Sequence, residues 1–110
     1  MSYKIVTIPS FDKELKILSK RHRSIKIDLA HLGKNLLENP KMGDEIIQNC
    51  FKIRMAITSK GKGKSGGARV ITFVYIQDET VYLLSIYDKS DKENISDKEL
   101  RDLIQSLDLE

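Results

Sequence analysis

Residues 51–87 read FKIRMAITSKGKGKSGGARVITFVYIQDETVYLLSIY, and this stretch decides the fold. At its start, residues 51–57 (FKIRMAI) alternate strictly between apolar side chains and others. Alternation with a period of two is typical of a β-strand with one buried face. Lys52 and Arg54 fall on the other face. The pattern therefore predicts a half-buried strand that presents two cations to solvent.

Two more strands are predicted in the rest of this stretch. Residues 58–67 (TSKGKGKSGG) have the composition of a loop. Residues 68–76 and 80–87 are rich in β-branched and apolar side chains, and we expect them to be joined through Gln77-Asp78-Glu79. The second of them is almost wholly apolar, which favours a central position in the sheet.

The residues before this stretch predict a strand and two helices. Residues 3–8 (YKIVTI) alternate and favour a strand, which Pro9 ends, and Ser10 can cap the helix that follows. The basic run KRHR at residues 20–23 predicts a bend, and Asn39-Pro40 ends the second helix because the residue before proline is pushed out of the α region. Apolar stripes at helical spacing lie on either side of the bend: Phe11, Leu15 and Leu18, then Ile25, Leu29, Leu32 and Leu36. Two helices joined so tightly should form an antiparallel pair.

A last helix is predicted from Ser96. Ser96 and Glu99 match a capping box, and Ile95 with Leu100 matches a hydrophobic staple. The element order β-α-α-β-β-β-α predicts one α+β domain over residues 1–110, the size of a single domain. We expect a mainly antiparallel sheet with the helix pair on one face, and a C-terminal helix.

The cations are concentrated in one part of the chain, although the net charge is only +3. Between Glu45 and Asp78 there is no acidic residue. A local basic patch on a nearly neutral protein indicates a specific site for a polyanion. The patch contains Lys52, Arg54, Lys60, Lys62, Lys64 and Arg69.

Several classes of site are excluded by composition. Cys50 is the only cysteine, so neither an internal disulfide nor a cysteine-based metal site can form, and we expect no metal and no cofactor. The N-terminus lacks the apolar segment of a signal peptide, and no stretch approaches the roughly 20 apolar residues that span a bilayer. These features predict a cytoplasmic protein that does not bind membranes.

Clustered cations of this kind suit cleavage of RNA by internal transesterification. That reaction needs stabilisation of the charge that develops on the phosphate, which cations supply. It also needs a base for the 2′-hydroxyl, and mutual repulsion can make a lysine a usable base. The strand with Lys52 and Arg54, the lysine-rich loop leading to Arg69, and the sequence Tyr87-Asp88-Lys89 could meet on one open face of the sheet.

Each of these features also has a structural interpretation. Lys52 and Arg54 could be solvated surface residues, Arg69 could pair with a C-terminal acid, and Tyr87 could be a core aromatic. The glycine-rich basic loop does not match a nucleotide-binding P-loop, because it lies between strands rather than opening a helix.

The other candidate nucleophiles and bases receive no catalytic role. His22 and His31 lie on or near the helices, and we interpret both as surface residues. Cys50, next to Phe51, fits a small buried residue better than a nucleophile.

The run from residue 51 to 96, preceded by LLENPKMGDEI at residues 36–46, resembles the RelE/HigB toxins of bacterial type II toxin–antitoxin modules. Within it, the features that carry the resemblance are K-I-R, the basic glycine loop, G-G-x-R-V-I and L-L-x-I-Y-x-K. The resemblance implies a RelE-like fold and a metal-independent endoribonuclease that cleaves messenger RNA, in the ribosomal A site. It also implies as partners the ribosome, messenger RNA and a cognate antitoxin, expected to be a small helix-turn-helix protein.

The resemblance also implies roles for particular residues. Lys52 and Arg54 match paired basic positions that contact and activate the RNA, and Arg69 matches an arginine that stabilises the transition-state phosphate. Lys89 falls where the family often has a basic residue near the leaving group. The best-known members carry a tyrosine or histidine in their final segment, and Tyr87 matches the tyrosine of this subgroup. The general base is left open.

Two other functions remain as alternatives. ParE-like toxins share the fold and poison a protein target such as gyrase, but that type lacks the basic cluster with a tyrosine. A general RNA-binding module would need exposed aromatic side chains for stacking, and the chain has no Trp, three Phe and four Tyr. Within the preferred interpretation, Lys60, Lys62 and Lys64 should bind ribosomal RNA as diffuse charge, because a glycine-rich loop cannot position them for chemistry.

Overall fold

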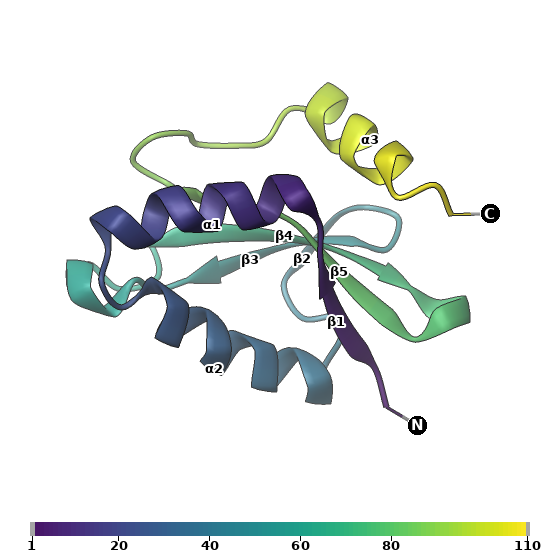
Figure 1. The fold of residues 1–110 in the computed structure, drawn as a ribbon, viewed down its shortest axis with the longest axis horizontal. Coiled ribbons are helices and arrows are strands. Elements are labelled where there is room, and N and C mark those ends of the chain that lie inside the picture. Colours follow the sequence, from purple (N-terminus) through teal and green to yellow (C-terminus); the bar gives the residue numbers. More distant parts are fainter. Residues whose placement is uncertain (1, 110) are drawn as a thin grey trace.

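A mixed β-sheet runs through the molecule (Figure 1). The structure is a computed structural model that describes residues 2–109, and over that range the sheet has five strands in the order β1-β5-β4-β3-β2. β1 pairs with β5 in parallel, and the other neighbours are antiparallel. The strands are β1 (Lys4–Thr7), β2 (Asp44–Ile47), β3 (Cys50–Met55), β4 (Ala68–Tyr75) and β5 (Thr80–Asp88).

The helices cover the two faces of this sheet. Helices α1 (Pro9–Arg21) and α2 (Ile25–Glu38) pack on one face, and their apolar stripes share a core with β3, β4 and β5. Helix α3 (Asp97–Ser106) packs on the other face, against a smaller apolar cluster around Ile71 and Leu84. The expected α+β architecture, with its helix pair on one face, is confirmed (Figure 1).

The observed helix ends show which of the predicted caps were correct. Glu99 N–H donates to Ser96 Oγ at 3.1 Å and Ser96 N–H donates to Glu99 Oε1 at 3.4 Å, so the predicted capping box of α3 is confirmed. Helix α2 ends at Glu38 with Asn39 as its cap, as Asn39-Pro40 predicted. The prediction that Ser10 caps α1 is wrong. The helix begins at Pro9, with Ile8 as its cap residue, because the fixed φ of proline suits the first helical position.

A β-bulge in β5 decides which residues reach each face of the sheet. The pairing of β4 with β5 passes from Ile71↔Ser85 to Thr72↔Leu83, so Leu84 is the extra residue. Glu14 of α1 holds the bulge, because its carboxylate accepts hydrogen bonds from Ser85 Oγ at 3.0 Å and from Ile86 N–H at 3.2 Å. An extra residue changes the alternation of the strand beyond it.

The changed alternation decides which face each residue at the end of β5 occupies. Ile86 joins the core beneath α1 and α2, whereas Tyr87 joins the cluster beneath α3. Asp88 then turns toward the end of α1, where it meets Arg21 and His22. With unbroken alternation Tyr87 would share the face of Val81 and Leu83, so the bulge is what places Tyr87 on the α3 face.

The loop between β3 and β4 is anchored at both of its ends. A 3₁₀ turn (Thr58–Lys60) opens it, and Asp28 of α2 accepts hydrogen bonds from Thr58 N–H at 2.9 Å and from Thr58 Oγ1 at 2.6 Å. At the other end, a Cβ on Gly67 would collide with the Met55 carbonyl oxygen, so only glycine fits there. The loop is thus tied to α2 and to β3.

Candidate functional site

Three of the predicted site residues are direct neighbours across the sheet. Arg54 of β3 pairs with Arg69 of β4, and Arg69 pairs with Tyr87 of β5. Side chains of directly opposite residues point to the same face. Lys52 lies two residues before Arg54 on β3 and shares that face. The strands therefore bring Lys52, Arg54, Arg69 and Tyr87 together, on the face opposite α1 and α2.

Lys52 and Arg54 form the accessible part of this row. Arg54 is exposed, and Lys52 is half-buried with its Nζ donating to Asn94 Oδ1 at 3.0 Å. Within residues 2–109, neither cation forms an ion pair with a carboxylate. Both charged groups are therefore open to an anion, although Asp44 of β2 lies directly opposite Lys52 on the same face.

Arg69 lies beneath the loop rather than at the surface. Its side chain is 4% exposed. The guanidinium donates to the carbonyl oxygens of Lys64 at 3.0 Å, Ala68 at 3.1 Å and Ser65 at 3.4 Å. Pairing with a C-terminal acid, the structural alternative, does not occur among the described residues. Arg69 therefore fixes the loop and leaves a positive charge without an acidic partner just below the surface.

Tyr87 packs as a core residue and carries a buried hydroxyl group. Tyr87 is 5% exposed and belongs to the cluster of Ile71, Leu84 and Leu100. The ammonium of Lys92 lies 5.2 Å from the ring centroid. The hydroxyl oxygen is buried and has no hydrogen-bond partner of good geometry among the described residues. Burial raises the pKa of Tyr87, although the backbone of Ile95 and the charge of Lys92 oppose the rise.

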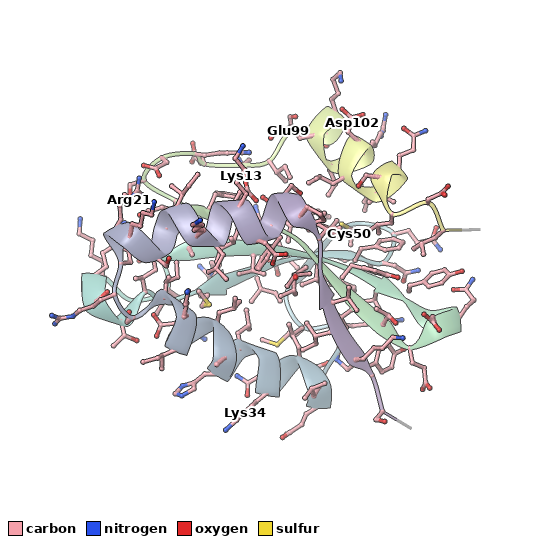
Figure 2. The ribbon with its side chains drawn as sticks, viewed as in Figure 1. Lys13, Arg21, Lys34, Cys50, Glu99 and Asp102 are labelled. Atoms are coloured by element: carbon pink, nitrogen blue, oxygen red, sulfur yellow. The ribbon has the colours of Figure 1, made fainter. Side chains whose placement is uncertain are left out.

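The buried carboxylate of Asp88 contacts basic side chains from two segments, the end of α1 and the loop after β3. Asp88 is 2% exposed, and its Oδ1 accepts from Lys60 Nζ at 2.8 Å. Its Oδ2 lies 2.8 Å from His22 Nε2 and 3.1 Å from Arg21 Nη2. We call Asp88 with Lys60, His22 and Arg21 the Asp88 cluster. Figure 2 shows Arg21 at the end of α1, well away from Asp102 on α3.

The Asp88 cluster corrects two expectations. His22 is not a surface residue, because its side chain is 14% exposed and contacts Asp88. Lys60 is not diffuse charge in a free loop, because its side chain is 16% exposed and is held by Asp88 and by Ser90 Oγ at 2.9 Å. Lys62 and Lys64 are exposed, as expected of loop residues.

Lys89 stands next to the glycine loop at the end of β5. Its backbone N–H donates to the Gly67 carbonyl oxygen at 3.0 Å, and its side chain is half-buried. The segment from Lys89 to Ser96 then crosses the α3 face, where it brings Asn94 to Lys52 and Lys92 to Tyr87. Sequence reasoning missed these two contacts, because DKENIS is a polar run without periodicity and carries no signal for its path.

The remaining candidates for chemistry are unsuited to it. Burial raises the pKa of the Cys50 thiol to about 12, so this residue is not a nucleophile near neutral pH. Across residues 2–109, no group of three or more His, Cys, Asp or Glu side chains is placed to hold a metal ion. No helix in the described part of the chain is long and apolar enough to cross a membrane.

Comparison with protein families gives a match over most of the chain. The family described as the RelE toxin of the RelE/RelB toxin–antitoxin system matches residues 15–107. This range includes the Asp88 cluster and the row of Lys52, Arg54 and Arg69, which we call the cationic row.

Solved structures of similar fold include those of an E. coli toxin. One is a variant of the E. coli toxin RelE in the free state, in which two arginines are replaced by alanine. It is 17% identical, with a TM-score of 0.63 over 96% of this chain and 98% of that chain. The same variant in complex with a peptide of the antitoxin RelB is 21% identical, with a TM-score of 0.54 over 88% and 98% of the two chains. At these identities the likeness establishes the fold.

Proposed function

Because the chain belongs to the family of RelE toxins of toxin–antitoxin systems, we propose that it is a metal-independent endoribonuclease that cleaves messenger RNA in the ribosomal A site. The observation that carries the proposal is the row of Lys52, Arg54 and Arg69. These cations sit on strands, share one face and lack acidic partners among the described residues.

The row suits a phosphate under attack by its own 2′-hydroxyl. Negative charge grows on the non-bridging oxygens as the phosphorane forms, and fixed cations stabilise that charge. Arg54 offers a planar fork that matches two phosphate oxygens, and Lys52 is held in place by Asn94. Arg69 adds positive potential from beneath the loop. We expect Lys89, whose backbone adjoins the same loop, to bind near the leaving 5′-oxygen.

Tyr87 suits the role of proton donor rather than base. Its raised pKa keeps the phenol protonated at neutral pH, and its hydroxyl has no partner of good geometry among the described residues. A protonated phenol can supply the proton that the leaving 5′-oxygen requires. The segment around Lys92 and Ile95 covers the hydroxyl, so bound RNA must displace that segment to reach it.

We expect Tyr87→Phe to slow cleavage by about tenfold to a hundredfold, because a general acid contributes roughly 10²–10⁴-fold and water can replace it in part. The free energy of unfolding should stay level or rise, since the substitution keeps the ring and removes an unpaired buried hydroxyl. Single-turnover cleavage and urea unfolding measure the two effects. Unchanged cleavage would assign Tyr87 to the core alone.

The exposed charges of the loop suit a ribosomal partner. Lys62 and Lys64 are exposed beside the row and can bind RNA phosphates as mobile charge, whereas Lys60 is occupied by Asp88. A cognate antitoxin, expected to be a small helix-turn-helix protein, would silence the toxin by covering this face. The solved E. coli toxin with an antitoxin peptide supports such a partnership.

Cleavage of a defined message on purified ribosomes tests the proposal. The product should carry a 2′,3′-cyclic phosphate, and a message with one 2′-deoxynucleotide at the cut site should resist cleavage there. Chelators selective for Zn²⁺ and Mn²⁺ should have no effect while ribosomal Mg²⁺ is maintained. Cleavage at the deoxy position, or a requirement for either metal, contradicts this mechanism. Growth arrest with intact messages and inhibited gyrase would instead favour a ParE-like toxin.

A further inference from the structure

A polar cleft opens beside the cationic row, between α2 and the outer edge of β3. Strand β2 pairs with β3 only as far as Asp44↔Lys52, so within the described residues the edge of β3 beyond Lys52 has no strand neighbour. The cleft at this open edge has a volume of about 200 Å³. Arg54 and Lys64 of the loop are among the residues that line it.

The lining divides into an apolar part and a polar part. Leu32, Met42 and Met55 supply the apolar part. His31 and Asn35 supply polar groups from α2, one turn apart on the same stripe. A cleft with apolar surface and a few convergent polar groups is typical of a ligand site.

The polar groups differ in whether they are already used. Asp28 also lines the cleft, but its carboxylate accepts hydrogen bonds from Thr58 and Ser24. Asn35 and His31 are exposed, and among the described residues neither side chain forms a hydrogen bond, although the charge of His31 acts on Asp28. Asp28 therefore stabilises the wall, while Asn35 and His31 are available to a ligand.

We propose that this cleft binds one nucleobase of the RNA, adjacent to the phosphate held by Lys52 and Arg54. The inference rests on the proposed function, because it extends the same substrate. An asparagine carboxamide offers a donor and an acceptor that match the edge of a base, and an imidazole can stack on its face. Arg54 and Lys64 at the mouth are placed for the flanking phosphates.

The size of the cleft limits what it can hold. Sites for drug-sized ligands measure roughly 300–1,000 Å³, so a cleft of about 200 Å³ suits one flat ring system rather than a whole nucleotide or a peptide. Inorganic phosphate would leave the apolar part of the lining unused. A base inserted here would leave its sugar and phosphate outside, facing the cations.

The two methionines in the cleft provide a direct probe of binding. In protein labelled with ¹³C at the methionine methyl groups, AMP, GMP, CMP and UMP are titrated separately, with ribose 5-phosphate as the ligand that lacks a base. We expect at least one nucleotide to shift the resonances of Met42 and Met55, and ribose 5-phosphate to leave them unmoved. Equal shifts with ribose 5-phosphate, or none with any nucleotide, overturn the proposal.

Substitutions in α2 separate a base site from general attraction to charge. Asn35→Ala should weaken binding of the nucleotide that binds best by about threefold to tenfold, since Asn35 is exposed and one net hydrogen bond contributes about that factor. The matched control is Lys34→Ala on the same helix, because Figure 2 shows Lys34 pointing away from the sheet. If Lys34→Ala weakens binding as much as Asn35→Ala does, the attraction is electrostatic and the proposal fails.

Cleavage on ribosomes distinguishes failure of the cleft from failure of the proposed function. If the base-binding cleft and the endonuclease function are both correct, Asn35→Ala should change the relative cleavage at different bases. The cleavage rate at the best site should fall less than it does when Lys52 is removed. Nucleotide shifts at Met42 and Met55 without any RNA cleavage support the base site and contradict the endonuclease. Cleavage with an unchanged base profile in Asn35→Ala, and no methyl shifts, contradicts the base site alone.

Discussion

The double variant Lys52→Ala/Arg54→Ala should cleave messenger RNA at least about 10³-fold more slowly than the wild type. Removing one group that stabilises transition-state charge costs roughly 10²–10³-fold, and the two cations act on the same phosphate. Their effects should therefore combine without adding in full. Single-turnover cleavage at saturating ribosome measures the loss, because that condition removes differences in binding.

Stability should change little in this double variant. Arg54 is exposed and Lys52 is half-buried with one hydrogen bond to Asn94, and substitutions at such surface positions usually lie within about 0.5 kcal/mol. The matched control is Lys26→Ala/Lys34→Ala, which removes two exposed cations from α2 and the same net charge. If the control slows cleavage as much, net charge rather than the row governs the reaction.

The sequence predicted the row of cations because a strand encodes its faces in its own residues. The pattern FKIRMAI places Lys52 and Arg54 opposite the core, and β3 buries Phe51, Ile53 and Met55 as that pattern requires. The strands that carry Arg69 and Tyr87 were predicted from the sequence, but the way in which they pair was not. Their register, which sets Arg54 beside Arg69 and Tyr87, depends on tertiary pairing.

Strand β2 was missed because its signal is short and mixed. It comprises only Asp44–Ile47, with two exposed residues before two half-buried ones, so no alternation is visible. Asn49, with a φ of 64°, lies in the two-residue turn that joins it to β3, and asparagine tolerates that conformation better than most residues. The observed sheet therefore has an edge strand that the expected order β-α-α-β-β-β-α lacked.

The bulge and the Asp88 cluster could not be read from local pattern at all. Residues 80–87 are nearly all apolar, so nothing in them marks Leu84 as the extra residue. The signal lies in Glu14, which is 71 positions before Ser85 in the chain and looks like an ordinary helix-surface residue. The partners of Asp88 are likewise distant, because Arg21, His22 and Lys60 lie 67, 66 and 28 positions before it. Such polar contacts between distant segments become visible only in the folded chain.

Asp88→Asn should lower the free energy of unfolding at neutral pH by about 3 kcal/mol. Removing one partner from a buried ion pair costs about 3–5 kcal/mol, and the lower end applies because the side chains of Lys60, His22 and Arg21 keep 16%, 14% and 45% of their exposure. The substitution keeps the shape of the side chain but removes its charge. Urea unfolding of both proteins measures the difference. A loss below about 1 kcal/mol would mean that Lys60, His22 and Arg21 become hydrated in the variant with little loss of folding free energy.

The dependence on pH follows from the sign of the pKa shift, and the wild-type advantage should disappear in acid. Burial raises the pKa of Asp88, but hydrogen bonds from Lys60, Ser90 and His22 outweigh it and hold the pKa far below 3.8. A carboxyl whose pKa is depressed in the folded state stabilises the fold above its unfolded pKa of about 3.9, and loses that contribution as pH falls toward its folded pKa. The gap between wild type and Asp88→Asn should therefore be present at about pH 5 and shrink below about pH 4. Asp102→Asn is the control, because its pair with Lys98 is 60% and 86% exposed and should contribute at most about 0.5 kcal/mol at any pH. A gap that persists unchanged to pH 2 would show that the carboxylate charge is not what holds the cluster.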